Sequence, residues 1–152
     1  MRSVILLLAS NLGLGYAPVA PGTFGTLAGI PCFWLLADRP MAFQAGIYLA
    51  LLAISCQVAH RAGRIYRTAD DGRIVIDELM GYLTTVLFLP FSWPTAVAAF
   101  VLFRVFDITK PPPVSTIDRM MKNGLGVVLD DVAAGIYAAA TLRIGLWLLA
   151  KF

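Results

Sequence analysis

The stretch "GRIVIDELMGYLTTVLFLP", Gly72 to Pro90, decides how the chain folds. From Leu79 onward it is typical of a helix that enters lipid, yet Asp77 and Glu78 stand side by side in its first turns. Adjacent helical residues point about 100° apart, so the two carboxylates could ligate one ion from two sides or two neighbouring ions. Helix capping explains one acid here better than two, and ionisable residues at membrane depth are functional by default.

The composition indicates a membrane protein. Of the 152 residues, 59% are hydrophobic and 14% are charged, and the mean hydropathy is +0.80. Soluble domains average about 45–50% apolar and about 25% charged residues. The apolar segments are continuous rather than alternating, which favours helices over a transmembrane barrel. One histidine and two cysteines without CxxC spacing argue against a zinc site.

We therefore predict an all-α, polytopic membrane bundle that forms a single domain over residues 1–152, with about four to five membrane helices. The first residues imitate a signal peptide, but a re-entrant or interfacial N-terminal helix fits better because the apolar run is minimal. The predicted spans are residues 23–37, 41–59, 74–89, 95–108 and 129–150. Only the second and the fifth approach the ~20 residues of a full span. The cluster "KPPPV", Lys110 to Val114, must end a helix.

Basic residues predict the orientation, because short cytoplasmic loops are rich in Lys and Arg. Most of them lie either between the second and third predicted spans or from the end of the fourth span to the start of the fifth: Arg61, Arg64, Arg67, Arg73, Arg104, Lys110, Arg119 and Lys122. The opposite side has Arg39, Arg143 and Lys151. The acids gather on the cytoplasmic side as well: Asp70, Asp71, Asp77, Glu78, Asp107, Asp118, Asp130 and Asp131. Acids contribute little to topology, so their clustering needs another cause.

A second acid pair, Asp130 and Asp131 in "NGLGVVLDDVAAG", stands at the mouth of another apolar helix. Two acid pairs at one membrane face repel each other unless a positive group lies between them. Mg²⁺ takes one or two carboxylates together with water and substrate phosphate. A divalent cation is the simplest way to keep Asp77, Glu78, Asp107 and the second pair ionised together, and protonation of some of them, as in a proton relay, is the alternative.

Two further segments suit a phosphate-bearing ligand. In "FRVFDITKPPP", Arg104, Asp107 and Lys110 are spaced three apart and predict one helical stripe, either a self-neutralising ladder of ion pairs or a site for a metal with an anion. In "YAPVAPGTFGTLAG", Thr23 can cap a helix, and the glycines at 22 and 25 leave backbone N–H groups open to an anion. A loop that only packs helices is the alternative for the second segment.

The four motifs "APVAPGTFGT", "IVIDELMG", "FRVFDITKPPPVSTIDR" and "NGLGVVLDDVAAG" together resemble the phosphatidylglycerophosphatase A family of bacterial integral-membrane lipid phosphatases. The likeness spans roughly residues 11 to 137. It implies Mg²⁺-dependent hydrolysis of phosphatidylglycerol phosphate to phosphatidylglycerol and phosphate, in a multi-pass protein of the bacterial inner membrane whose active site faces the cytoplasm. The lipid substrate and membrane lipids are the expected partners, and no nucleic acid is expected.

With this resemblance, the carboxylates and basic residues receive predicted roles. We expect Mg²⁺ at Asp77, Glu78, Asp107 and Asp131, with Asp130 as ligand or general base, and catalysis at Asp77, Asp130 and Asp131. Thr23, Gly25, Arg104 and Lys110 are expected to bind the phosphate. Attack by water and attack by an Asp carboxylate both remain open. An ion-coupled transporter is the alternative function, although its acids would be spread across the membrane depth.

Overall fold

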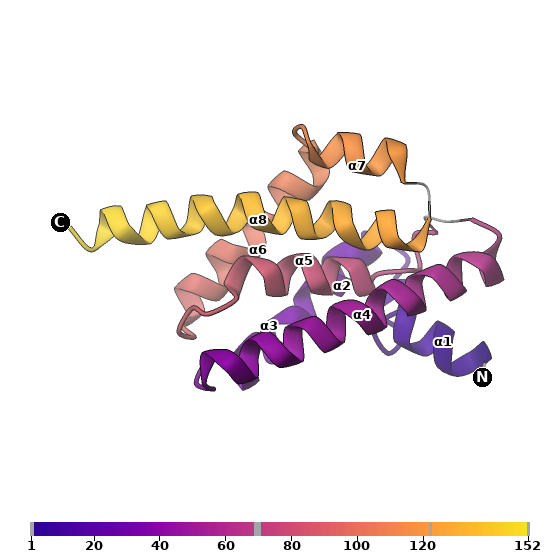
Figure 1. The fold of residues 1–152 in the computed structure, drawn as a ribbon, viewed down its shortest axis with the longest axis horizontal. Coiled ribbons are helices and arrows are strands. Elements are labelled where there is room, and N and C mark those ends of the chain that lie inside the picture. Colours follow the sequence, from indigo (N-terminus) through magenta and orange to yellow (C-terminus); the bar gives the residue numbers. More distant parts are fainter. Residues whose placement is uncertain (1, 69–70, 122, 152) are drawn as a thin grey trace.

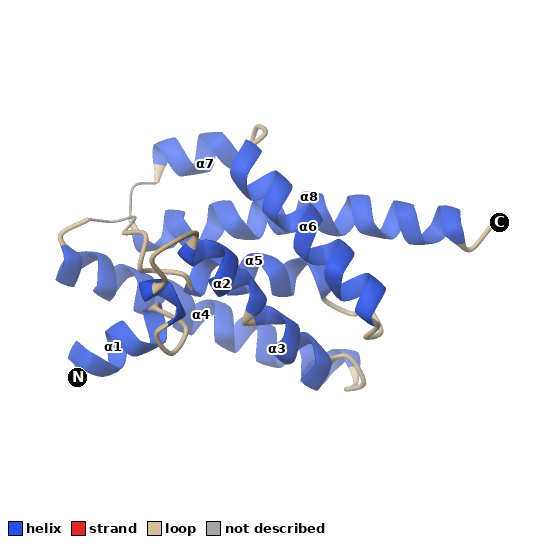
Figure 2. Cartoon of the chain, turned by 180° about the vertical axis from the view of Figure 1, so that it is seen from behind, coloured by secondary structure: helices blue, strands red, loops and turns tan. Residues whose placement is uncertain are grey.

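The computed structural model describes residues 2–68, 71–121 and 123–151, and in these residues it contains helices and no strand (Figure 2). Asp70 and Lys122, which the orientation argument counts, lie outside the described residues. The elements in chain order are α1 (Arg2–Ala9), the 3-10 turn η1 (Leu14–Tyr16), α2 (Pro21–Leu27), α3 (Gly29–Leu36), α4 (Met41–Tyr66), α5 (Ile76–Val86), α6 (Trp93–Thr109), α7 (Val114–Met120) and α8 (Gly124–Leu149). The predicted all-α fold is confirmed.

Two helices, α4 and α8, are long and apolar enough to cross a membrane. Each helix has 26 residues. In each, the mean hydropathy of an 18-residue window is 1.6, and only 22% of the residues in that window are buried inside the protein. The core helix of a soluble protein would bury most of such a surface, so the exposed apolar faces favour lipid as the solvent. In Figure 1 these two helices run along the molecule, and α5 lies between them and contacts both.

Several predicted boundaries are wrong. The predicted span 23–37 is two short helices, α2 and α3, because Pro31 in the first turn of α3 has no N–H to donate to the preceding turn. The predicted span 74–89 shrinks to the 11 residues of α5, and the chain then turns at Phe88, whose φ is +64°. Conversely, α4 continues to Tyr66, beyond its predicted end at residue 59, since hydropathy locates lipid contact rather than the end of a helix.

The remaining helices agree better with the prediction. Helix α6 lies close to the predicted span 95–108 and ends at Thr109, as the triproline segment requires. Helix α8 begins at Gly124, five residues before the predicted start, with Asn123 as its N-cap. The Asn123 Oδ1 accepts hydrogen bonds from the N–H groups of Leu125 and Gly126, both at 3.0 Å. The short helix α7 was not predicted.

Glycines bring α5 and α8 into close contact. A Cβ on Gly135 of α8 would overlap the carbonyl oxygen of Gly81 in α5 and lie 2.8 Å from the Thr84 Cβ. A Cβ on Gly81 would in turn overlap the Phe103 ring and lie 2.8 Å from the Asp131 carbonyl oxygen. Small residues allow helix backbones to approach closely in a membrane. This contact places the first turn of α5 beside the acid pair of α8.

Arg143 on α8 stabilises the opposite end of α5. Its guanidinium donates to the carbonyl oxygens of Leu87, at 2.5 Å, and Thr85, at 3.4 Å, which the helix end leaves without partners. Arg143→Met should therefore cost about 1–3 kcal/mol and lower the melting temperature in detergent. Arg39→Met, which changes an exposed arginine, is the matched control and should leave the melting temperature unchanged. Equal melting temperatures for Arg143→Met and the wild type would contradict this capping role.

Candidate active site

The first turn of α5 is held in place by the N-terminal loop. The Val75 N–H donates to the Ala9 carbonyl oxygen at 2.8 Å, and the Asn11 amide donates to the Val75 carbonyl oxygen at 2.7 Å. Both backbone groups of the residue that precedes α5 are thereby fixed. Asp77 and Glu78 follow two and three residues later, so these contacts as well as α5 define their positions.

The end of α6 contributes three ion pairs, one within the helix and two to other helices. Within the helix, an Arg104 Nη1 donates to an Asp107 oxygen at 2.6 Å. Lys110 follows the helix with a positive φ of 42°, and its Nζ lies 2.7 Å from Asp130 Oδ2 and 3.1 Å from Asp118 Oδ1. The predicted stripe therefore holds for Arg104 and Asp107, whereas the turn after the helix directs Lys110 to α7 and α8.

The side chains of these ion pairs, except Arg104, line one polar cavity of about 160 Å³. Its lining residues come from α5, the end of α6, α7 and α8: Asp77, Glu78, Asp107, Lys110, Asp118, Val127, Asp130 and Asp131. Carboxylates from separate helices thus converge at a single place. The transporter alternative requires acids that are spread along a path through the bundle. The acids that line this cavity are gathered at one place instead.

The cavity offers oxygen ligands that lack partners. One carboxylate oxygen from each of Asp77, Glu78 and Asp131 can be chosen so that all three atoms lie within 4.8 Å of one another. Within the described residues, Asp77 Oδ1, Glu78 Oε2, Asp130 Oδ1 and Asp131 Oδ2 are buried and accept no hydrogen bond. Buried unpaired carboxylates are costly, and hard divalent cations take such oxygen ligands. The residues present therefore fit a divalent cation.

Asp107 is not in this group of three, although it lines the same cavity. Its ion pair with Arg104 occupies one of its oxygens. Its assignment as a metal ligand stays a prediction, as do the catalytic roles of Asp77, Asp130 and Asp131.

Ion pairs shift the pKa values of two charged groups, Lys110 at the cavity and Asp71 in the loop before α5. Burial alone would lower the pKa of Lys110, but its contacts with Asp130 and Asp118 outweigh burial and raise the pKa. Lys110 is therefore cationic at neutral pH. In the loop before α5, hydrogen bonds from Arg73 hold the pKa of Asp71 below its usual value. This exposed ion pair stabilises the loop outside the cavity.

In the glycine-containing segment "YAPVAPGTFGTLAG", Gly22 and Gly25 have different surroundings. Ala20 is the N-cap of α2, so the prediction that Thr23 caps this helix is wrong. Gly25 packs against Val75, where a Cβ would lie 2.7 Å from the Val75 Cβ, and neither Thr23 nor Gly25 lines the acidic cavity. Gly22 lies against residues of the site, because a Cβ there would overlap Glu78 Oε1 and lie 3.2 Å from Arg104 Nη1. Phosphate binding by Thr23 and Gly25 stays a prediction.

Two other residues of the site were missed. Asn11 is buried and contacts α5 from a distant loop, and a single asparagine has no periodic pattern that would reveal this. Asp118 reaches the cavity on α7, and its place among the acids gathered on one side of the membrane was the available signal.

Comparison with known proteins gives a consistent family. A family model described as Phosphatidylglycerophosphatase A matches residues 7–146. Phosphatidylglycerophosphatase A of Escherichia coli strain K12 is 35% identical over 137 residues, which cover 90% of this chain and 80% of that protein. The enzyme of the same name from Haemophilus influenzae is 37% identical over 148 residues, covering 95% and 91%. A Bacteroides thetaiotaomicron protein, provisionally named a phosphatidylinositol-3-phosphatase, is 31% identical over 152 residues, covering 95% and 94%. No solved structure matches the chain.

Proposed function

The chain belongs to the phosphatidylglycerophosphatase A family, and we propose that it hydrolyses phosphatidylglycerol phosphate to phosphatidylglycerol and inorganic phosphate in a Mg²⁺-dependent reaction. The observation that carries this proposal is the convergence of six carboxylates from four helices on one cavity, four of them with a buried oxygen that has no partner among the described residues. The substrate phosphate and these acids are both negative. A cation held by the acids would allow the phosphate to bind beside them.

The metal ligands proposed are Asp77, Glu78 and Asp131, with Asp107 as a further ligand. When bound, Mg²⁺ would polarise the phosphoryl oxygens and lower the pKa of a coordinated water. The chain's own contribution is to hold these carboxylates in place before substrate arrives, through the Val75 backbone contacts and the close packing of α5 on α8. Preorganised charge of this kind costs no rearrangement during the reaction.

Asp130 is the proposed general base. Its Oδ2 is held by Lys110, while its buried Oδ1 has no partner within the described residues and can accept a proton from the attacking water. Lys110 and Arg104 would neutralise charge on the transferred phosphoryl group. Direct attack by an Asp oxygen, which gives an aspartyl-phosphate, is the alternative, and rapid quenching with labelled substrate would detect that intermediate.

The size of the cavity supports a reaction on the headgroup alone. At about 160 Å³ it is smaller than the ~300–1,000 Å³ typical of small-molecule pockets. A terminal phosphate fits there, whereas the acyl chains of the lipid must stay outside in the bilayer. This is the expected arrangement for an enzyme that receives its substrate from the membrane.

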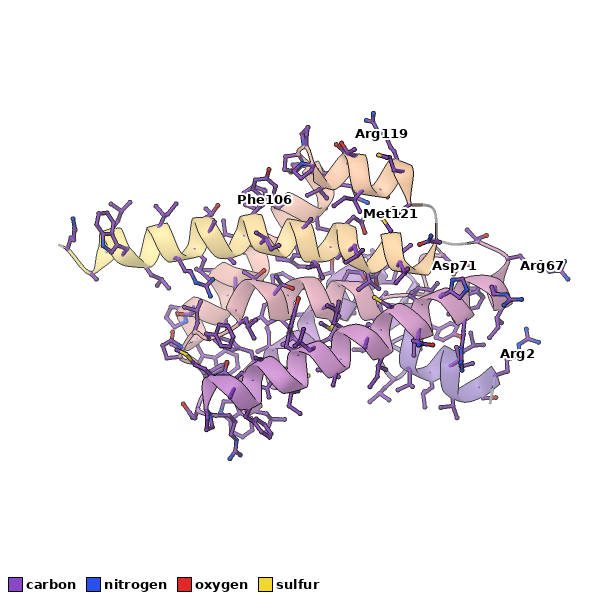
Figure 3. The ribbon with its side chains drawn as sticks, in the orientation of Figure 1. Arg2, Arg67, Asp71, Phe106, Arg119 and Met121 are labelled. Carbon is purple, nitrogen blue, oxygen red and sulfur yellow. The ribbon has the colours of Figure 1, made fainter. Side chains whose placement is uncertain are left out.

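A multi-pass location with the site at the cytoplasmic face is part of the proposal. Arg2, Arg67 and Asp71 lie at one end of the molecule (Figure 3), as the rule of positive cytoplasmic loops predicts. Near the end of α3, the start of α6 and the end of α8, three tryptophans are exposed: Trp34, Trp93 and Trp147, at 61%, 67% and 57%. Exposed tryptophans are typical of the membrane–water interface. The helix ends that carry these tryptophans lie away from the start of α1 and the end of α4, where Arg2 and Arg67 are found (Figure 1).

Purified protein in detergent tests the proposal directly. Phosphate release should require Mg²⁺, stop with EDTA, and be faster from phosphatidylglycerol phosphate than from phosphatidic acid or phosphatidylinositol 3-phosphate of the same acyl chains. Full activity in EDTA would contradict the metal requirement. Preference for either comparison lipid would overturn the substrate assignment while leaving the phosphatase chemistry in place.

A further inference from the structure

A second, larger groove lies between α1 and α4, with a volume of about 560 Å³. Its walls are Val4, Ile5 and Leu8 from α1 and Ala53, Ile54, Gln57, Val58 and Arg61 from α4. None of these residues lines the acidic cavity, whose walls come from α5 to α8. The groove has the size of a small-molecule site and no place in the proposed hydrolysis.

The groove is amphipathic along its length. Ala53, Gln57 and Arg61 are four residues apart on α4, so they form one row along the helix. The small side chain of Ala53 leaves space at the apolar end of the row. Gln57 and Arg61 supply the polar groups toward the C-terminal end of α4. A ligand that fits must therefore have an apolar chain and a polar head at a fixed end.

The positive charge at the polar end of the groove favours a ligand with an anionic headgroup. Among the described residues, Arg61 forms no ion pair, Gln57 has no side-chain hydrogen bond, and no acid lines the groove. Figure 3 shows Arg2, at the start of α1, at the same end of the molecule as Arg67, which follows α4. Basic residues at this level of a membrane attract anionic lipid headgroups.

We propose that this groove binds one anionic phospholipid, with an acyl chain between α1 and α4 and the headgroup phosphate at Arg61. The groove and the catalytic cavity share no lining residue, so we assign this lipid to a second site, distinct from that of the substrate. The apolar walls supply binding through buried area, and Arg61 supplies the preference for negative charge.

Native mass spectrometry of the detergent-purified protein tests this site, with phosphatidylglycerol and phosphatidylcholine of identical chains as probes. We expect one phosphatidylglycerol to be retained in preference to phosphatidylcholine. Arg61→Gln should weaken phosphatidylglycerol retention about fivefold, and Ala53→Trp should remove most of it by filling the groove. Arg64→Gln, one turn away on α4, and Ile144→Trp, on the exposed face of α8, are the matched controls and should retain the lipid.

The same measurement in an Asp131→Asn background separates the groove from the catalytic cavity, and retention should persist there. Equal loss in Arg61→Gln and Arg64→Gln would overturn the proposal, since it would indicate only a general attraction to basic residues. Retention by Ala53→Trp, loss in Asp131→Asn, or equal retention of both lipids would overturn it as well. None of these outcomes depends on turnover, so they leave the proposed hydrolysis untouched.

Discussion

Asp131→Asn and Asp77→Asn will each reduce phosphate release from phosphatidylglycerol phosphate by about a thousandfold or more. Both side chains are buried, at 5% and 7% exposure, and each offers an oxygen to the group of three that fits a divalent cation. An amide has nearly the shape of the carboxylate but no charge, so the cavity keeps its size and loses one of the charged ligands that attract the cation. Turnover measured at saturating Mg²⁺ checks this result.

Melting temperature distinguishes loss of the metal site from loss of the fold. Mg²⁺ should raise the melting temperature of the wild type, because a ligand that binds only the folded state stabilises it. In Asp131→Asn this increase should vanish, while the melting temperature in EDTA should equal or exceed that of the wild type, since one unpaired buried charge is gone. Asp38→Asn, an exposed acid away from the cavity, is the control and should behave as the wild type. An Asp131→Asn protein that retains full turnover, or a normal response to Mg²⁺, would contradict the assignment.

The sequence predicted the features that depend on chemical type. A continuous apolar run reveals a membrane helix wherever it is long, so α4 and α8 were located although their ends were not. Two acid pairs at one membrane face need a positive partner between them, and this requirement predicted that Asp77 and Asp131 lie close together. The cavity confirms their convergence.

Features that depend on tertiary contacts could not be read from the sequence. Gly25 and Gly22 look equivalent in the glycine loop, yet Gly25 packs against Val75 while Gly22 lies against Glu78 and Arg104. Lys110 fits a helical stripe by spacing, but the backbone turn that follows α6 sends it to Asp130 instead. Each outcome is decided by a neighbour that is distant in the chain, which neither periodicity nor propensity encodes.

Lys110→Met should reduce turnover by about a hundredfold to a thousandfold, which is the usual effect of removing one preorganised donor from a transition state. Lys110 is the only cationic side chain that lines the cavity within the described part of the chain, and it contacts Asp130 directly. Without it, the phosphoryl group enters a cavity of acids with one positive charge fewer, and the proposed base loses the group that orients it. Lys110→Arg keeps the charge with a different shape and should recover part of the activity.

Inhibition by inorganic phosphate separates a direct role from a structural one. If Lys110 binds the phosphoryl group, Lys110→Met should weaken inhibition by phosphate along with turnover, whereas a lysine that only ties α6 to α8 would lower the melting temperature and leave phosphate inhibition unchanged. Asp118→Asn is the matched control, because it removes the other partner of the same ammonium group. The Asp118 side chain is 41% exposed, so its ion pair contributes at most about 1 kcal/mol and the variant should remain within about fivefold of the wild type. Equal losses in Lys110→Met and Asp118→Asn would therefore show that the pairing of α6 with α7, rather than the positive charge in the cavity, is what the reaction requires.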